Sequence, residues 1–175
     1  GNITQRDIKG SDKAIVFTQK YAFDKINRLE KTTNATGQSW TNEYDVASNL
    51  VKQTNPDNTT QTSSFDTLKR ATQNLDQAQS ATGFEYNKLN QLTKVTDARG
   101  SVTSYEYNKF GELTKQTSPD TGGSSFTYDK AGNMLTKTGA KNITTSYSYD
   151  ALNRPVSVNY SGATDKIMYS YEAVA

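Results

Sequence analysis

The sequence contains no cysteine and no histidine. Without cysteine, disulfide bonds and thiolate metal sites are excluded. Without histidine, the chain lacks the commonest general base and the commonest metal ligand. We therefore expect a protein that is not an enzyme, with no catalytic residue, no bound metal and no cofactor.

Large apolar residues are also scarce, since Leu, Ile, Val and Phe together make only 29 of the 175 residues. So low a content is typical of disordered chains, but disorder also requires a high net charge, and this chain carries +2. No apolar run approaches the roughly 18 residues that a membrane-spanning helix needs, so we predict no membrane insertion. Lys and Arg do not cluster, so we predict no nucleic-acid partner.

Tyrosine, threonine, asparagine and serine are what the chain has in place of aliphatic residues. The 11 tyrosines suit a pleated, half-buried surface, and Asn and Ser suit turns. Good helix formers never recur at helical spacing for more than about one turn. The composition therefore predicts an all-β protein.

An internal repeat of 21 residues organises the chain. Its marker, which we call the anchor, is an aromatic residue followed by Asp, Asn or Glu. The anchors are Phe23, Tyr44, Phe65, Tyr86, Tyr107, Tyr128, Tyr149 and, after one inserted residue, Tyr171. We interpret residues 1–175 as a single array with an irregular first unit, residues 1–20, and expect it to be a fragment of a larger protein.

Other columns of the repeat have their own residue types. The third residue after each anchor is apolar: Ile26, Ala47, Leu68, Leu89, Phe110, Ala131, Leu152 and Val174. The sixth is apolar as well, usually Leu. Two residues before most anchors stands a second aromatic, which a strand places on the same face as the anchor. These columns predict an aromatic ladder packed along one face of a sheet.

Two turns are predicted in every repeat. The residue after the anchor can fold back onto its own backbone as an Asx-turn, notably at Asp24, Asp45, Asp66, Asp129 and Asp150. Three residues later stand Gly111, Gly132 or, elsewhere, mostly Asn, which tolerate the left-handed backbone of tight hairpins. We expect the apolar residue inside this loop to plug the hairpin end. A second, type I turn follows the next strand, as in Asn55-Pro56-Asp57-Asn58.

Two turns and two short strands fill 21 residues, so the chain is predicted to be a continuous antiparallel array of hairpins. One hairpin is only marginally stable in water, but stacked hairpins support one another through cross-strand pairs. The open strands at both ends of such an array can pair edge to edge, which predicts self-association.

The repeat resembles that of the Rhs/YD (tyrosine–aspartate) family. Clear copies begin at Tyr105-Glu106-Tyr107-Asn108, Phe126-Thr127-Tyr128-Asp129 and Tyr147-Ser148-Tyr149-Asp150. The family includes bacterial Rhs proteins, the C component of insecticidal toxin complexes, wall-associated proteins and animal teneurins. The chain departs from the motif where its Gly is replaced, at Asn27, Ser48, Lys69, Asn90 and Asn153, and it has no match to the family's aspartyl self-cleavage motif.

This resemblance implies a curved antiparallel sheet that forms part of a spiral β-shell. It implies a structural scaffold in a secreted or cell-surface bacterial protein, with the other YD repeats of the parent chain and an encapsulated C-terminal toxin or effector as partners. The alternative is an extracellular binding or adhesion module that recognises glycans or surface proteins.

Three columns have competing interpretations. The Asp column could bind Ca²⁺, but calcium needs six to eight converging oxygens and each hairpin supplies one carboxylate, which favours Asx-turns. The tyrosines and Trp40 could form a carbohydrate platform, but core packing is the usual role of such a ladder. The recurring Lys and Glu columns favour cross-strand ion pairs if they share a face, which depends on the hairpin register.

Overall fold

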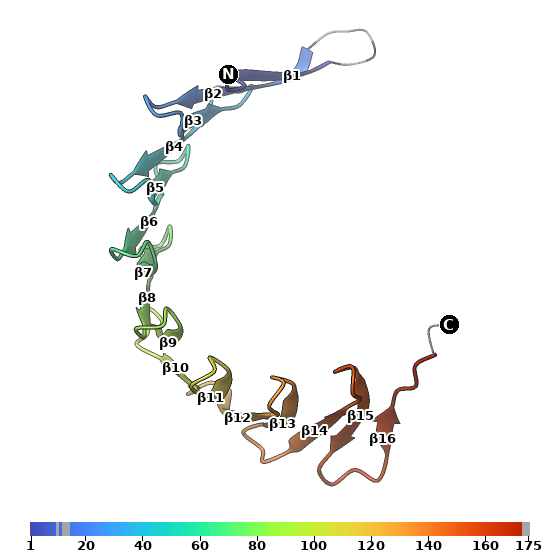
Figure 1. The fold of residues 1–175 in the computed structure, drawn as a ribbon. Coiled ribbons are helices and arrows are strands. Elements are labelled where there is room, and N and C mark those ends of the chain that lie inside the picture. Colours follow the sequence, from blue (N-terminus) through green and yellow to red (C-terminus); the bar gives the residue numbers. More distant parts are fainter. Residues whose placement is uncertain (10, 12–14, 173–175) are drawn as a thin grey trace. The chain divides into compact units, whose positions relative to one another are not determined.

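The computed structural model describes residues 1–9, 11 and 15–172 (Figure 1). Every regular element in these residues is a β-strand, which confirms the predicted all-β class. None of them forms a helix with the length and hydrophobicity to cross a membrane. Val174, the last residue of the apolar loop column, lies outside the described residues.

The chain divides into two compact units, Gly1–Gly83 and Phe84–Ala175. The strands of the first unit are β1 (Gln5–Lys9), β2 (Ile15–Phe23), β3 (Leu29–Thr33), β4 (Ser39–Tyr44), β5 (Leu50–Thr54), β6 (Thr60–Phe65) and β7 (Ala71–Leu75). Strand β8 (Ala81–Tyr86) contains the boundary. The strands of the second unit are β9 (Leu92–Thr96), β10 (Val102–Tyr107), β11 (Leu113–Ser118), β12 (Gly122–Tyr128), β13 (Met134–Thr138), β14 (Thr144–Tyr149), β15 (Pro155–Tyr160) and β16 (Lys166–Met168).

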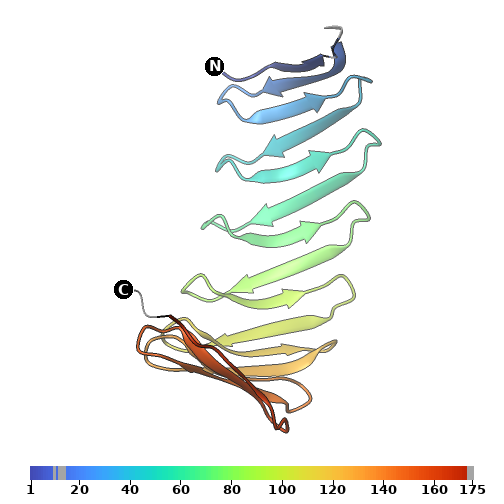
Figure 2. The ribbon, with the colours of Figure 1, turned by 90° about the vertical axis from the view of Figure 1, so that its right-hand side faces the viewer.

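The order of the strands in the sheet is their order in the sequence. Within each unit every strand lies antiparallel to the next, and short loops join them alternately at the two ends of the strands (Figure 2). The predicted array of hairpins is confirmed.

A β-bulge follows six of the anchors. In the hairpin of β4 and β5, Glu43 lies opposite Lys52 while Tyr44 lies opposite Leu50, so Val51 is the extra residue. The same register shift occurs at Phe23, Phe65, Tyr107, Tyr128 and Tyr149. A three-residue loop that ends in a left-handed residue imposes such a bulge on the strand that leaves it. The bulge sets the sixth residue after the anchor, the Leu column, directly opposite the aromatic ring.

The left-handed residue is found where the sequence predicts a permissive turn residue. In the hairpin loops it is Asn27, Ser48, Lys69, Asn90, Gly111, Gly132 or Asn153, all with φ between 60° and 88°. The second turns use the same geometry, for example at Gly37, Asn58 and Gly100. Ser48 and Lys69 adopt it although neither residue type favours positive φ, so the surrounding hydrogen bonds hold them there.

The predicted packed aromatic core is wrong. Among the described residues Val158 is the buried hydrophobic residue, 8% exposed, and no side chain is less than 2% exposed. The anchors from Phe23 to Tyr149 are half-buried, and Tyr171 is 42% exposed. Burial fails because a core requires a second layer against the sheet, whereas each ring here packs only against neighbours in its own layer.

Candidate functional site

The hairpin loop after each anchor, which we call the YD loop, is closed by an Asx side chain. In residues 24–28, Asp24 N–H donates to the Arg28 carbonyl and Asn27 N–H donates to the Asp24 carbonyl, at 2.9 and 3.0 Å. One carboxylate oxygen of Asp24 accepts the backbone N–H groups of Ile26 and Arg28, at 3.0 and 2.9 Å. The side chain thus occupies two backbone donors that the short loop leaves unpaired.

The second polar atom of the Asx side chain, a carboxylate oxygen in Asp or the amide nitrogen in Asn, binds the side chain four positions later. The type of that partner depends on whether the Asx residue is Asp or Asn. An Asp faces a donor: Arg28 and Arg154 donate through Nε at 2.6 and 2.7 Å, and Asn49 and Asn133 through Nδ2 at 2.7 and 2.9 Å. An Asn faces an acceptor: Asn87 donates to Gln91 at 2.7 Å and Asn108 to Glu112 at 2.6 Å. The sequence carries the signal for this pairing, because the fifth residue after the anchor changes type together with the first.

These contacts lower the pKa of the loop aspartates. In Asp24 and Asp150 the largest cause is the hydrogen bond from the backbone of the Arg four residues later, and the Arg side chain adds to it. In Asp45, Asp66 and Asp129 the side chain of the partner is the largest cause. The carboxylates therefore stay charged well below neutral pH.

In five repeats the anchor hydroxyl binds the repeat before. The Tyr44, Tyr107, Tyr128 and Tyr149 hydroxyls donate to the carbonyls of Leu29, Leu92, Leu113 and Met134, at 2.9, 2.9, 2.9 and 3.0 Å. Tyr171 does the same to Pro155 at 2.7 Å. Each acceptor is the sixth residue after the preceding anchor. The prediction treated anchors as packing aromatics and missed this hydrogen bond, which Phe23 and Phe65 cannot make.

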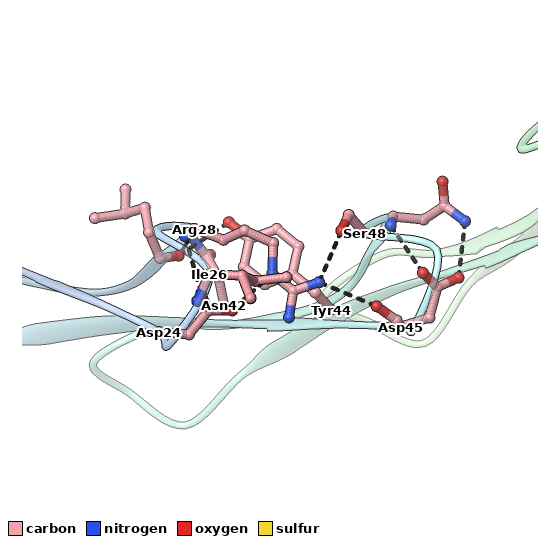
Figure 3. Close-up of polar contacts among 9 residues, drawn as sticks. Asp24, Ile26, Arg28, Asn42, Tyr44, Asp45 and Ser48 are labelled. Carbon is pink, nitrogen blue, oxygen red and sulfur yellow. Dashed lines mark hydrogen bonds and ion pairs between the residues drawn. The ribbon is translucent and has the colours of Figure 1, made fainter.

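Arg28 joins two successive YD loops (Figure 3). Its guanidinium lies 4.6 Å from the centre of the Tyr44 ring and donates to the Asp45 carbonyl and the Ser48 hydroxyl, each at 3.1 Å. Because the same group is fixed by Asp24, one side chain binds its own loop, the next anchor and the next loop. Arg154 repeats part of this arrangement, 4.2 Å from the centre of the Tyr171 ring.

Other neighbouring YD loops are also in contact. Lys69 donates to the Ala47 carbonyl at 2.7 Å and Gln91 donates to the Gly111 carbonyl at 3.2 Å. Asn133 donates to the side chain of Asn153 at 2.8 Å. Within each unit the loops therefore lie side by side along one rim of the sheet.

The Lys and Glu columns share a face, as the ion-pair hypothesis required. Lys52 pairs with Glu43, Lys94 with Glu85 and Lys115 with Glu106, at 2.8, 2.8 and 3.2 Å. This face is otherwise rich in Ser and Thr, and the anchors occupy the opposite face. Exposed pairs of this kind contribute less than about 1 kcal/mol each, so they define register and solubility more than stability.

The prediction that the apolar loop residue plugs the hairpin end is wrong. Ile26, Leu68, Leu89, Phe110 and Leu152 are 63%, 61%, 69%, 76% and 72% exposed. The Asx-turn explains why: it binds the backbone N–H of this residue, as at Leu68, and directs its side chain out of the loop.

The carboxylates do not converge. Both oxygens of Asp24, Asp45, Asp129 and Asp150 accept hydrogen bonds within their own loops. In the part of the chain that the structure describes, no three acidic residues are grouped as metal ligands. Trp40 is half-buried on β4 and lies in a shallow depression with Gln38, Asn58 and Gln77.

The comparisons with known proteins agree with this geometry. The RHS Repeat family model matches residues 23–60, 86–123 and 128–165. The chain belongs to the RHS Repeat family. Its 21-residue hairpins, with their anchors and Asx loops, are a structural repeat scaffold. A comparison with curated proteins finds no match.

Solved structures share the fold of this RHS repeat array. The crystal structure of TcdB2-TccC3-Cdc42 matches with a TM-score of 0.71 and 17% identity over 88% of this chain and 10% of that one. TcdB2-TccC3 without its hypervariable C-terminal region matches with a TM-score of 0.70 and 18% identity over 85% and 9%. A Tc holotoxin pore from Photorhabdus luminescens matches with a TM-score of 0.69 and 16% identity over 83% and 9%. The chain thus spans about a tenth of each.

Proposed function

We propose that this RHS array is one wall segment of a larger β-shell, secreted by a bacterium, that encloses a C-terminal toxin or effector, and that it has no catalytic role itself. The array is then one continuous element of residues 1–175 within a longer protein. The matched structures belong to toxin assemblies about ten times its length, which supports the proposal.

The observation that carries the proposal is the surface area. The chain exposes 12409 Å². A folded monomer of its mass, 19.3 kDa, exposes about 8,500 Å². A sheet with two uncovered faces has this excess because nothing packs against its half-buried aromatic rings. A wall of a closed container needs no second layer of its own, since its contents and its neighbouring wall segments can cover it.

The test uses the whole natural protein that carries these repeats. We expect a C-terminal piece to resist protease while the protein is native and to be digested once denaturant opens the shell. Mass spectrometry of the resistant fragments identifies the piece. A natural protein in which no region outside the repeats is protected, or one that contains only this array, overturns the proposal.

A second candidate function is a binding module for carbohydrates, and it depends on Trp40. Trp40 replaces the Thr or Ser that most other repeats have four residues before the anchor, and amide side chains surround it. An aromatic platform with amide hydrogen-bonding groups suits a sugar ring. Saturable binding on a glycan array, lost in Trp40→Ala and kept in the matched variant Thr103→Ala, supports this function. Absence of saturable binding removes it.

A further inference from the structure

The exposed apolar side chains of the YD loops form a row that nothing in the hairpin requires. Isolated exposed apolar residues are normal on a protein surface. Here, however, the third residue after the anchor is apolar in all seven described loops, and its five large members are 61–76% exposed. The hydrogen bonds of the loop use only the backbone of this residue, and among the five large side chains the Phe110 ring also lies 4.9 Å from Lys109 Nζ. A position that is apolar in every loop but not buried within the chain points to a contact with another molecule.

The row lies along one rim of the sheet. The YD-loop rim consists of residues 24–28, 45–49 and 66–70 in the first unit and 87–91, 108–112, 129–133 and 150–154 in the second. Successive loops touch within a unit, as Gln91 and Gly111 do at 3.2 Å. One hairpin advances the array by two strands, so the apolar side chains recur at about 9.6 Å.

The opposite rim carries small or rigid residues at the same spacing. The second-turn rim consists of residues 34–38, 55–59 and 76–80 in the first unit and 97–101, 118–122 and 139–143 in the second. Its tips, twelve residues after the anchor, are small or rigid at every turn except one: Ala35, Pro56, Ala98, Pro119 and Ala140. The second-turn rim thus presents an Ala or Pro in most hairpins, at the same spacing as the large apolar side chains of the YD-loop rim. Each is followed by an exposed polar residue: Thr36, Asp57, Arg99, Asp120 or Lys141.

The charges of the two rims are opposite in sign. The YD loops contain eight basic and six acidic residues, and the second turns contain two basic and four acidic residues. The negative charge of the second turns lies in the first unit, with two acidic residues and no basic one, while the second turns of the second unit are neutral. Contact of a YD-loop rim with the second turns of the first unit is therefore attractive. Contact between two YD-loop rims would bring the exposed Lys88, Lys109 and Lys130 close to the same residues of the other copy.

We propose that the YD-loop rim of one array docks on the second-turn rim of another, with a second copy of this chain as the partner in solution. The large loop side chains then insert between the Ala and Pro tips, once per hairpin. The inference deepens the proposed wall function, because a wall wider than one strip of hairpins must join its strips along their rims.

The absence of cysteine makes the test clean, since any introduced thiol is unique. Phe110→Cys and Ala98→Cys chains are mixed and treated with a bismaleimide that spans about one hairpin spacing, so that the register of docking does not matter. We expect mixed dimers to exceed dimers of either variant alone. Thr127→Cys, exposed on a strand face, replaces Phe110→Cys as the matched control and should give few dimers with Ala98→Cys.

Sedimentation velocity then measures the apolar contribution. The triple variant Leu89→Ser, Phe110→Ser and Leu152→Ser should weaken association about tenfold for each side chain removed. Val102→Ser with Leu135→Ser, strand residues that are 38% and 37% exposed, is the control and should leave association unchanged.

Three results would overturn the inference. One is an excess of Phe110→Cys dimers over mixed dimers. Another is association that persists in the triple variant, which would indicate pairing through the open strands β1 and β16. The third is a chain that stays monomeric at millimolar concentration. Failure of the protease-protection test leaves this result untouched, because rim docking does not depend on what a shell contains.

Discussion

The matched pair inside each YD loop gives a sharp test of how the hairpins are held. In the loop 108–112 the Asn108 amide donates to the Glu112 carboxylate at 2.6 Å. Asn108→Asp replaces this donor by a carboxylate and sets two negative charges against each other. The variant loses a hydrogen bond to a charged group and gains a repulsion, and both groups are half-buried. We expect a loss of about 1–2 kcal/mol at pH 7, a melting point lower by ~2–8 °C.

The double variant Asn108→Asp with Glu112→Arg should recover most of that loss. It recreates the Asp–Arg pairing that the chain already uses between Asp150 and Arg154 at 2.7 Å. Thermal unfolding followed by circular dichroism gives the coupling energy from the four members of the cycle. Hydrogen exchange of the Phe110 amide, which donates to Asn108 at 2.9 Å, reports on the loop itself.

The salt dependence separates repulsion from misfolding. Added salt screens the repulsion between the two carboxylates, so the cost of Asn108→Asp alone should shrink as ionic strength rises. A single variant as stable as the parent, or a double variant no more stable than the single one, would show that the match between the two positions has no energetic meaning.

Three further predictions address the other parts of the repeat. Tyr107→Phe removes the hydroxyl that donates to the Leu92 carbonyl at 2.9 Å and should cost about 1 kcal/mol in urea unfolding; an unchanged midpoint would mean that water replaces the hydroxyl without loss. Gly111→Ala should lower the free energy of unfolding by about 1 kcal/mol or more, because φ is 88° and the new methyl would lie 3.2 Å from the Gln91 amide nitrogen. Gly100→Asn, where φ is 81° and nothing is nearby, should be nearly neutral. Equal melting points for the two variants would contradict this. The lowered pKa of the loop aspartates means that the unfolded chain binds more protons in acid, so stability should fall as pH drops below about 4. Burial raises the pKa of Tyr107, so stability should fall again above about pH 10. A melting point that is flat across either window would refute the corresponding assignment.

The sequence by itself determined the strands, the two turns per repeat and the antiparallel array. A 21-residue period with fixed aromatic, apolar and turn columns has few solutions, because Asx residues and left-handed positions act within a few residues of themselves. The RHS Repeat match covers the same columns. Local chemistry, repeated many times, is what a single sequence reveals best.

Tertiary structure alone decided how each column is used. Whether Tyr44 reaches the Leu29 carbonyl depends on the bulge opposite it and on the neighbouring hairpin, 15 residues away. The exposure of Leu89 and Phe110 depends on where the loop directs its side chains. The sequence pattern of an apolar column is the same whether its side chains are buried or exposed. The sequence of the aromatic ladder likewise does not reveal whether a second layer covers the rings. Burial is a property of what packs against a surface, and that is settled only when the strands are placed beside their neighbours.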